Sequence, residues 1–328
     1  MSAPELLLPK DYLEDACDRI GRAQKRVLIL AMTFSEDKST IPLMEALIAA
    51  AKRGVRVEVT ADVFTYGDAA GKFFPLFYFN KKARRLTKMR KKLRNSGVHF
   101  WWLGRAHPFI FGGRTHSKWC IVDDTVYSFG GINIHAEALE NTDYMLKIQD
   151  EALANELDNL QRRIEHEDKS GKITSGSHKF KHKEDTVFID GGMMGSSIIY
   201  RRVCALAKQS KSVLLVSQYC PTGKLSRILK NKEAKLYFNL PPKDTPRNWF
   251  LIGVGMLFSQ NKTLYNRTGY LHAKFIIFEM PNGEKVAVSG SYNFAFISVL
   301  FGTREIAIET RNPKTINQLE KFFQEHVA

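Results

Sequence analysis

The sequence has few cysteines, no long apolar run and fewer acidic than basic residues. Its four cysteines, Cys17, Cys120, Cys204 and Cys220, are far apart and form no Cys-x-x-Cys pair. We therefore expect free thiols in a reducing compartment and no zinc site. No stretch approaches ~20 uninterrupted apolar residues, so no membrane-spanning helix is expected. The N-terminus lacks the basic and apolar regions of a signal peptide. These absences predict a cytoplasmic protein, with any membrane contact peripheral at the inner face.

The shortage of acidic residues leaves a strong positive charge. There are 49 Lys and Arg against 34 Asp and Glu, which gives a net charge of +15. Such an excess favours a polyanionic partner: nucleic acid, an anionic membrane surface or a phosphate-bearing substrate. Charge alone does not choose among these. The 328 residues, 44% of them hydrophobic, are enough for a sizeable core in one large or two medium domains.

The predicted secondary structure repeats once along the chain. In each half two helix–strand pairs come first, and a further strand and a closing helix come last. The first half has helices at 12–25, 41–53 and 151–165 and strands at 26–30, 55–60 and 144–148. The second half has helices at 198–208, 223–230 and 314–327 and strands at 212–217, 234–239 and 305–309. This alternation predicts an α/β fold with mixed, mainly parallel sheets, and the repetition predicts two halves related by a pseudo-dyad.

Composition gives the domain boundaries. We predict an N-terminal half at 1–165, a polar linker at 166–185 and a C-terminal half at 186–328. The linker is rich in Ser, Gly, Lys and His. His178 and His182 lie four residues apart in it, and we interpret them as part of a solvated basic segment, not a metal site.

The first half contains an insertion, at about 64–95, that the second half lacks. It opens with an aromatic cluster that includes Phe73, Phe74 and Phe77, and continues into a segment with many cations and no acidic residue. The cations include Lys88, Arg90, Lys91 and Lys92. Aromatic residues beside cations suit an anionic membrane surface. The same composition also suits nucleic acid, or a solvated helix whose Phe residues lie in the core.

One unusual motif occurs twice. Residues 116–133 read His-x-Lys, four residues, Asp123, six residues, then Gly-Gly-x-Asn. Residues 272–293 read His-x-Lys, four residues, Glu279, then a later Gly-Ser-x-Asn. A single His-x-Lys occurs often by chance. Two full copies at matched places in two repeated halves predict a catalytic role.

Strand geometry predicts which side chains of the motif lie together. Residues i and i+2 of a strand share a face, so each histidine should point the same way as the lysine two residues later. If the motifs turn back at 124–125 and at 282–283, His116 pairs with Asn133 and His272 pairs with Asn293.

These residue types suit phosphodiester cleavage. Lys118 and Lys274 can neutralise the non-bridging oxygens, and Asn133, Asn293 and backbone N–H groups can hydrogen-bond them. One histidine can attack phosphorus and hold the phosphoryl group, while the other protonates the leaving alkoxide and then acts as a base. Because the lysines supply the charge, the scheme needs no metal and no cofactor.

Acidic residues near the motifs have two predicted roles. Each histidine needs a partner that fixes its tautomer, and Asp143 and Glu305 lie at matched distances after Asn133 and Asn293. They are the candidate orienting carboxylates, with ordinary surface carboxylates as the alternative. Asp123 and Glu279 lie nearer the turns, where we expect a structural role.

Two further histidines, His107 and His135, lie near the first motif. They have no repeat to support them, and structural and substrate-lining roles both stay open.

The doubled motif resembles that of the phospholipase D superfamily, over nearly the whole chain. The resemblance implies two α/β/α halves with the site where they meet, His116 as the nucleophile and His272 as the general acid. It also implies that Glu305 orients His116 and Asp143 orients His272. Residues 49–57, 62, 95–98 and 130–134 are similar to bacterial cardiolipin synthases and related phosphatidyltransferases. The N-terminal membrane helices usual in those synthases are missing.

Three functions remain after the sequence is read. The leading hypothesis is a phosphatidyltransferase or phospholipase acting on anionic phospholipid at a membrane surface, and the second is a metal-independent nuclease. The third is a catalytically idle phosphate-binding module, against which the intact His, Lys and Asn residues argue. Because both motifs are in one chain, we expect a functional monomer.

Overall fold

A computed structural model describes residues 4–65, 81–104, 113–172, 174–241 and 261–328, together with Gly253, Met256 and Ser259. The chain divides into two compact units. Unit 1 comprises Met1–Ser128, Ile132–Glu140 and Tyr144–Ser175. Unit 2 comprises Phe129–Gly131, Asn141–Asp143 and Gly176–Ala328. Two short segments from the first repeat are therefore part of the second unit.

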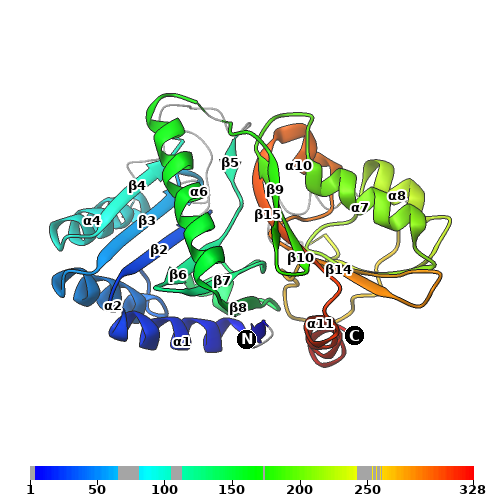
Figure 1. The fold of residues 1–328 in the computed structure, drawn as a ribbon, viewed down its shortest axis with the longest axis horizontal. Helices are drawn as coiled ribbons and strands as arrows, with labels where there is room; N and C mark the ends of the chain where they lie inside the picture. The colour runs from blue at the N-terminus through cyan, green and yellow to red at the C-terminus, as the bar shows by residue number, and fades with distance from the viewer. Residues whose placement is uncertain are drawn as a thin grey trace. The chain divides into compact units, whose positions relative to one another are not determined.

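Unit 1 is built on a mixed sheet (Figure 1). The sheet contains β1 (Glu5–Leu7), β2 (Arg26–Ala31), β3 (Arg56–Asp62), β4 (His99–Leu103), β6 (Trp119–Val122), β7 (Thr125–Ser128) and β8 (Met145–Gln149). Unit 1 also has the short strand β5 (Arg114–Thr115), which lies outside this sheet. Its helices include α1 (Pro9–Arg22), α2 (Ile41–Lys52), α4 (Lys81–Asn95), α5 (Ala136–Leu139) and α6 (Glu151–Lys169). The strand order is β1-β8-β7-β6-β2-β3-β4.

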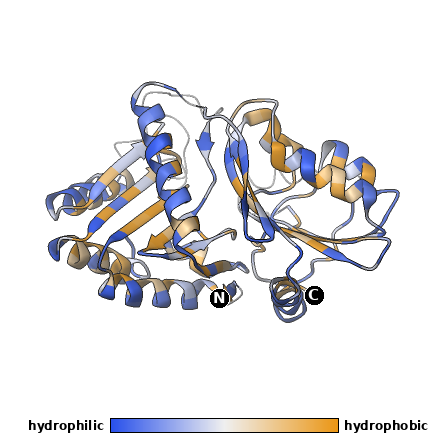
Figure 2. Cartoon of the chain, viewed as in Figure 1, coloured by the Kyte–Doolittle hydropathy of each residue, from blue (hydrophilic) through white to orange (hydrophobic). Residues whose placement is uncertain are grey.

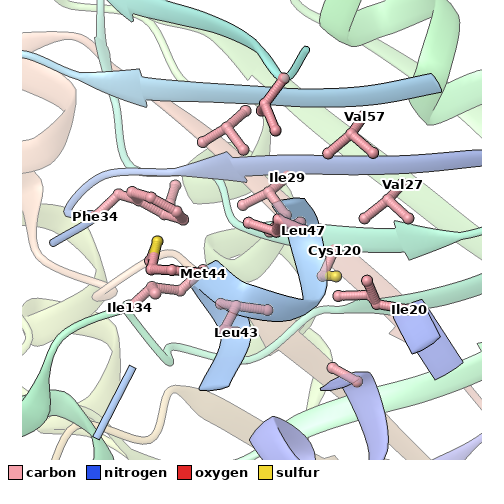
Figure 3. Packing of buried hydrophobic residues seen from close by; sticks show 14 of the residues in the cluster. Ile20, Val27, Ile29, Phe34, Leu43, Met44, Leu47, Val57, Cys120 and Ile134 are labelled. Carbon is pink, nitrogen blue, oxygen red and sulfur yellow. The ribbon is translucent and has the colours of Figure 1, made fainter. Parts of the chain in front are cut away.

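Helices cover both faces of this sheet because β2 is apolar on both sides. Val27 and Ile29 on one face pack with Ile20 of α1, Leu47 of α2 and Cys120 of β6, as Figure 3 shows. Burying each such aliphatic side chain contributes roughly 1.5–3 kcal/mol. On the opposite face lies α6, which Figure 2 shows mainly in hydrophilic colours.

Helix α6 is attached to the sheet through four buried polar residues, Asp158, Gln161, Glu165 and Asp168. The side chain of Gln161 accepts a hydrogen bond from Trp119 Nε1 at 2.8 Å. The helix begins after Asp150, whose carboxylate accepts from the backbone N–H of Leu153 at 3.0 Å. Polar residues therefore fix both the start of this helix and its packing on the sheet.

Unit 2 repeats the same plan. Its strands include β9 (His178–His182), β10 (Asp185–Gly191), β11 (Ser212–Val216), β12 (Glu233–Tyr237), β13 (Phe275–Glu279), β14 (Lys285–Gly290) and β15 (Thr303–Thr310). Its helices include α7 (Ile198–Gln209), α8 (Gly223–Leu229), α10 (Phe296–Phe301) and α11 (Pro313–His326). The strand order is β9-β10-β15-β14-β13-β11-β12, and its run from β10 to β12 matches the run from β1 to β3 in unit 1. Val203 of α7 and Leu225 of α8 belong to one core cluster, while Phe322 of α11 packs on Phe275 from the other face.

The predicted α/β fold in two repeated α/β/α halves is confirmed, but the prediction of mainly parallel sheets is wrong. Among the described strands of unit 1, only β2–β3 and β3–β4 pair in parallel, and in unit 2 only β11–β12 does. In each unit the motif forms a hairpin and the next strand follows without a long crossover helix. Direct connections of this kind give antiparallel neighbours.

The segment predicted as a polar linker, 166–185, is partly regular structure. Its first residues complete α6, and His178–His182 form β9, which pairs with β10. The chain passes from unit 1 to unit 2 between Ser175 and Gly176, inside this segment. The alternation of cations with His and Phe in β9 is that of a strand with two different faces.

Candidate active site

The first motif lies between β5 and β6 in unit 1. His116 and Lys118 are both buried, with 9% and 1% of their surfaces exposed. Lys118 Nζ donates to the backbone carbonyl of His116 at 2.7 Å. The preceding residue, Thr115, donates its N–H to Asp62 Oδ2 at 2.8 Å. Asp62 at the end of β3 therefore fixes the backbone that carries the histidine.

The second motif has the same local contact in unit 2. Lys274 is fully buried, and its Nζ donates to the backbone carbonyl of His272. The same Nζ lies 3.2 Å from His272 Nδ1. Burial lowers the pKa of Lys274 to about 8, although Asp143 and Glu305 both raise it. At neutral pH the lysine is therefore a buried cation beside the histidine, with a proton it loses more readily than a surface lysine does.

Asp143 lies directly against the second histidine. Its Oδ2 is 2.6 Å from His272 Nδ1, and its Oδ1 accepts the N–H of Gly131 at 3.2 Å. A Cβ atom on Gly131 would lie 2.6 Å from Asp143 Oδ2 and 2.8 Å from the His272 carbonyl. Glycine is therefore required here so that the carboxylate can reach the imidazole.

Glu305 has a matching place after the second motif. Its carboxylate accepts hydrogen bonds from Ser291 Oγ and, at 2.9 Å, from Thr303 Oγ1. Ser291 holds the position in the second motif that Gly131 holds in the first. Each repeat thus joins its carboxylate to the small residue before the motif asparagine. The pairing of Glu305 with His116 stays a prediction.

The two motif asparagines are also buried. Asn133 is 7% exposed and Asn293 is 4% exposed. Within the described part of the chain, the Oδ1 atoms of both have no hydrogen-bond partner. A buried amide oxygen without a partner is costly unless something else satisfies it. Both asparagines are therefore candidates to contact a ligand or a bound water.

The predicted pairing of each histidine with its asparagine is wrong. In unit 1 the turn lies at Asp123-Asp124, and the ladder ends with Trp119 opposite Ser128. Phe129 then has a φ of +58°, so the strand cannot continue to Asn133. In unit 2 Glu279 pairs with Lys285, one position away from the predicted register. A five-residue connection in place of a two-residue turn explains that shift.

The motif acids bind the backbone or other residues remote from the histidines. Asp123 has a φ of +52°, and its carboxylate accepts the N–H groups of Gln24, Lys25 and Arg26. Glu279 accepts from Ser212 Oγ at 2.9 Å. These contacts are those expected of residues that attach the motif hairpin to the neighbouring strand.

The basic part of the insertion is helix α4. Lys88, Lys91 and Lys92 are exposed and Arg90 is half-buried. Lys92 Nζ contacts Glu36 at 2.5 Å. The aromatic residues Phe73, Phe74 and Phe77, like His107, lie outside the described residues.

His135 is half-buried near α5. Its Nδ1 lies 2.9 Å from Glu137 Oε2. No cluster of three or more His, Cys, Asp or Glu suited to a metal occurs among the described residues. No helix within the described ranges is long and apolar enough to cross a membrane.

Three contributors to the site were not predicted from the sequence. Asp62 lies two residues after the predicted strand at 55–60 and ends the observed strand β3, and its place after that strand was the available signal for its role. The other two contributors are the contact between Gly131 and Asp143 and the contact between Ser291 and Glu305. Each joins residues more than ten positions apart, so no local sequence pattern predicts it.

The chain is similar to known proteins in sequence and in fold. Residues 16–164 match the family described as "Cardiolipin synthase, PLD-like domain". Cardiolipin synthase B of Escherichia coli (strain K12) is 29% identical over 167 residues, which cover 46% of this chain and 36% of that protein. The Salmonella typhi protein of the same name is 27% identical over 159 residues, 44% of this chain and 34% of its own length. The chain thus matches about a third of the length of these relatives.

Two solved structures share the fold over nearly the whole chain. Phosphatidylserine synthase of Haemophilus influenzae Rd KW20 has a TM-score of 0.72 at 14% identity, covering 99% of this chain and 87% of that one. Polyphosphate kinase of Porphyromonas gingivalis has a TM-score of 0.64 at 13% identity, covering 97% and 49%. Residues 16–164 are thus similar to the phospholipase D-like domain of the cardiolipin synthase family, and the chain shares the fold of these two solved structures.

Proposed function

We propose that the protein is a phosphatidyltransferase or phospholipase that cleaves a phospholipid phosphodiester through a phosphohistidine. The observation that carries this proposal is the contact of 2.6 Å between Asp143 Oδ2 and His272 Nδ1, beside the buried Lys274. A carboxylate on one ring nitrogen favours the protonated imidazole and leaves Nε2 for proton transfer. The similarity to cardiolipin synthase B supports phospholipid as the substrate.

In the first half-reaction His116 attacks phosphorus with a ring nitrogen. A P–N bond forms and the P–O bond to the leaving alkoxide breaks, while His272 gives its proton to that alkoxide. Lys118 and Lys274 offset the negative charge of the phosphoryl oxygens, and the amides of Asn133 and Asn293 donate hydrogen bonds to them.

In the second half-reaction an alcohol or water gives its proton to His272 and attacks phosphorus. The new P–O bond forms as the P–N bond breaks, which returns both histidines to their starting states. Transfer and hydrolysis therefore differ only in which hydroxyl attacks the phosphohistidine. Glu305 would orient His116 as Asp143 orients His272.

The test offers two substrates to the same protein. Phosphatidylglycerol vesicles and plasmid DNA would each be incubated with the protein, with and without EDTA. We expect lipid turnover that EDTA leaves unchanged and that His116→Ala or His272→Ala abolishes. His326→Ala, which removes a histidine from α11 outside both motifs, should retain it. DNA cleavage without lipid turnover would instead establish the nuclease alternative.

Helix α4 is the proposed contact with the anionic membrane surface. Each cation near such a surface contributes roughly 1 kcal/mol. Replacing Lys88, Arg90, Lys91 and Lys92 with Gln should reduce co-sedimentation with anionic vesicles and spare neutral ones. The matched control replaces four exposed lysines outside α4, namely Lys208, Lys235, Lys314 and Lys321. Equal loss in both variants would show that only overall charge matters.

A further inference from the structure

A cavity of about 360 Å³ lies in unit 2 against α7 and the strands β9, β10 and β15, which Figure 1 labels. Its volume falls in the range of small-molecule sites. The charged side chains of its described lining are Lys179, Lys181, Arg202, Arg311 and Glu309. None of these residues belongs to a His-x-Lys motif, and the reaction proposed above does not use them.

The strand register brings the side chains of three strands to one face of the sheet. Thr186 of β10 lies opposite Lys181 of β9 on one side and opposite Glu309 of β15 on the other. Phe188, two residues further along β10, lies opposite Lys179. Cross-strand partners point to the same face, and so do residues i and i+2 of a strand. Both lysines therefore lie on one face with Glu309.

Helix α7 covers part of this face. Phe188 of β10 packs with Tyr200 and Val203 of α7 in one core cluster. Strand β9 is the edge strand of the sheet, and Lys179 and Lys181 are both exposed. The two ammonium groups are therefore open to solvent beside the helix, where a ligand can reach them.

One buried carboxylate holds both arginines of the lining. Glu309 is 4% exposed and accepts from Arg202 Nε at 2.6 Å, from Arg202 Nη2 at 2.7 Å and from Arg311 Nη1 at 3.2 Å. Burial alone would raise the pKa of Glu309, but the two arginines hold that pKa below its ordinary value. Glu309 is therefore ionised at neutral pH and fixes the two guanidinium groups before any ligand arrives, which lowers the entropy cost of binding.

Donors remain after these contacts are made. Among the described residues, Arg202 Nη1 and Arg311 Nη2 have no hydrogen-bond partner, and Lys179 and Lys181 have no ion-pair partner. Glu284, outside the lining, pairs with Arg311 Nε at 2.8 Å. Four cations against the two carboxylates leave an excess of two positive charges at the cavity. Such a surplus of charge and of N–H donors favours a dianion.

A phosphate monoester group has the matching chemistry. It carries a charge of about −1.5 to −2 at pH 7 and has three terminal oxygens that accept hydrogen bonds. A phosphodiester has one negative charge and two terminal oxygens, so it would leave part of the excess charge and of the donors unused.

We propose that this cavity is a phosphate site additional to the two motifs, and that it binds the phosphate monoester group of a small molecule or of a lipid headgroup. Lys179, Lys181 and the two arginines contact its terminal oxygens. Along β15 the site lies four residues from Glu305, which is roughly 13 Å in an extended strand. Because binding here needs no turnover, the proposal can hold or fail whatever the outcome for the proposed function.

The test is a calorimetric titration of the whole protein with ethyl phosphate, a monoester, and with dimethyl phosphate, a diester. We expect ethyl phosphate to bind more tightly. Lys179→Gln/Lys181→Gln removes two exposed cations and leaves the contacts of Glu309 in place. The dissociation constant of ethyl phosphate should rise about tenfold in this double variant, because two exposed charge contacts are lost.

Two further double variants are the controls. Lys235→Gln/Lys314→Gln removes the same charge from exposed positions in β12 and α11 and should keep the wild-type constant. Lys179→Arg/Lys181→Arg keeps the charge and should keep most of the affinity. Any binding of the probe at the motifs is common to all these proteins, so differences between them report on the cavity.

Co-sedimentation with phosphatidylcholine vesicles identifies the source of the phosphate. The vesicles contain phosphatidic acid, a monoester, or phosphatidylglycerol, a diester, at matched surface charge. A loss in Lys179→Gln/Lys181→Gln that is confined to phosphatidic acid assigns the site to a lipid headgroup, and a loss in calorimetry alone assigns it to a soluble phosphate monoester. Wild-type binding of both monoester probes by this variant, an equal loss in the Lys235→Gln/Lys314→Gln control, or no preference for the monoester in either measurement would overturn the proposal.

Discussion

The contact between Asp143 and His272 gives the sharpest prediction. Asp143→Asn keeps the size of the side chain but removes its charge, and the buried imidazole loses a charge-assisted hydrogen bond of 2.6 Å. Such bonds contribute roughly 1.5–3 kcal/mol, and each 1.36 kcal/mol in the barrier is a tenfold change in rate. We therefore expect turnover to fall about 10- to 100-fold.

The pH profile should change as well. Burial lowers the pKa of Lys274 to about 8, and the Asp143 carboxylate is one of the two charges that raise it. A lysine is cationic below its pKa, so removing that carboxylate makes Lys274 lose its charge at lower pH. The alkaline limb of the rate profile should therefore move to lower pH in Asp143→Asn.

The assay is the initial rate of phosphatidylglycerol turnover from pH 5.5 to pH 9.5, with a thermal melt of each variant. Asp158→Asn is the matched control, because Asp158 is equally buried but pairs with Arg26 and Arg56 of unit 1. It should lower the melting temperature and leave the pH profile unchanged. A turnover in Asp143→Asn within twofold of wild type, with an unmoved alkaline limb, would refute the orienting role.

Three further predictions test other parts of the structure. Wild-type activity should decline as the pH rises through about 8, where Lys274 loses its proton; a rate that stays level to pH 9.5 would contradict the need for its charge. Gly290→Ala should destabilise the fold by several kcal/mol in chemical denaturation, because a Cβ there would lie 2.1 Å from a backbone oxygen of β15. Gly21→Ala is the control: its Cβ would enter open space in α1, and the variant should be more stable by about 0.5–1 kcal/mol. Asp123→Ala should lower the free energy of unfolding by about 2–3 kcal/mol, because three backbone N–H groups lose their acceptor, while the folded protein keeps its turnover. Glu279→Gln should lower it by less than about 1 kcal/mol. A large loss of rate without a loss of stability in either variant would argue against a structural role.

Much of the fold could be predicted because its helices and strands have clear periods. The predicted helix at 41–53 is α2, Ile41–Lys52, and ends where Gly54 adopts a φ of +88°. The predicted strand at 212–217 is β11, Ser212–Val216. Whether neighbouring strands pair in parallel or antiparallel could not be predicted from their periods, because it depends on the connections between the strands.

Part of the candidate site could likewise be predicted from the sequence, and part could not. Spacing along a strand predicted that each lysine would lie with its histidine, and both lysines do reach back to the histidine carbonyl. The register of the hairpins could not be predicted, since Asp123 forms its turn through bonds to a distant strand. A cavity of about 440 Å³ in unit 1 left no sequence signal, because its walls come from four separate segments, at 33–37, 65, 85–86 and 135–137.

Phe129–Gly131 and Asn141–Asp143 belong to unit 2 although they lie in the first half of the sequence, so the chain cannot be cut once into two complete units. Cutting between Ser175 and Gly176 would not yield two self-sufficient pieces, because the C-terminal fragment would keep His272 and lose the carboxylate and glycine that hold it. The histidine of the second repeat, His272, is therefore oriented by Asp143, which lies in a loop of the first repeat. A fragment with one motif would therefore need that loop supplied in trans, and complementation between separately expressed halves would measure how far the duplicated copies have become dependent on each other.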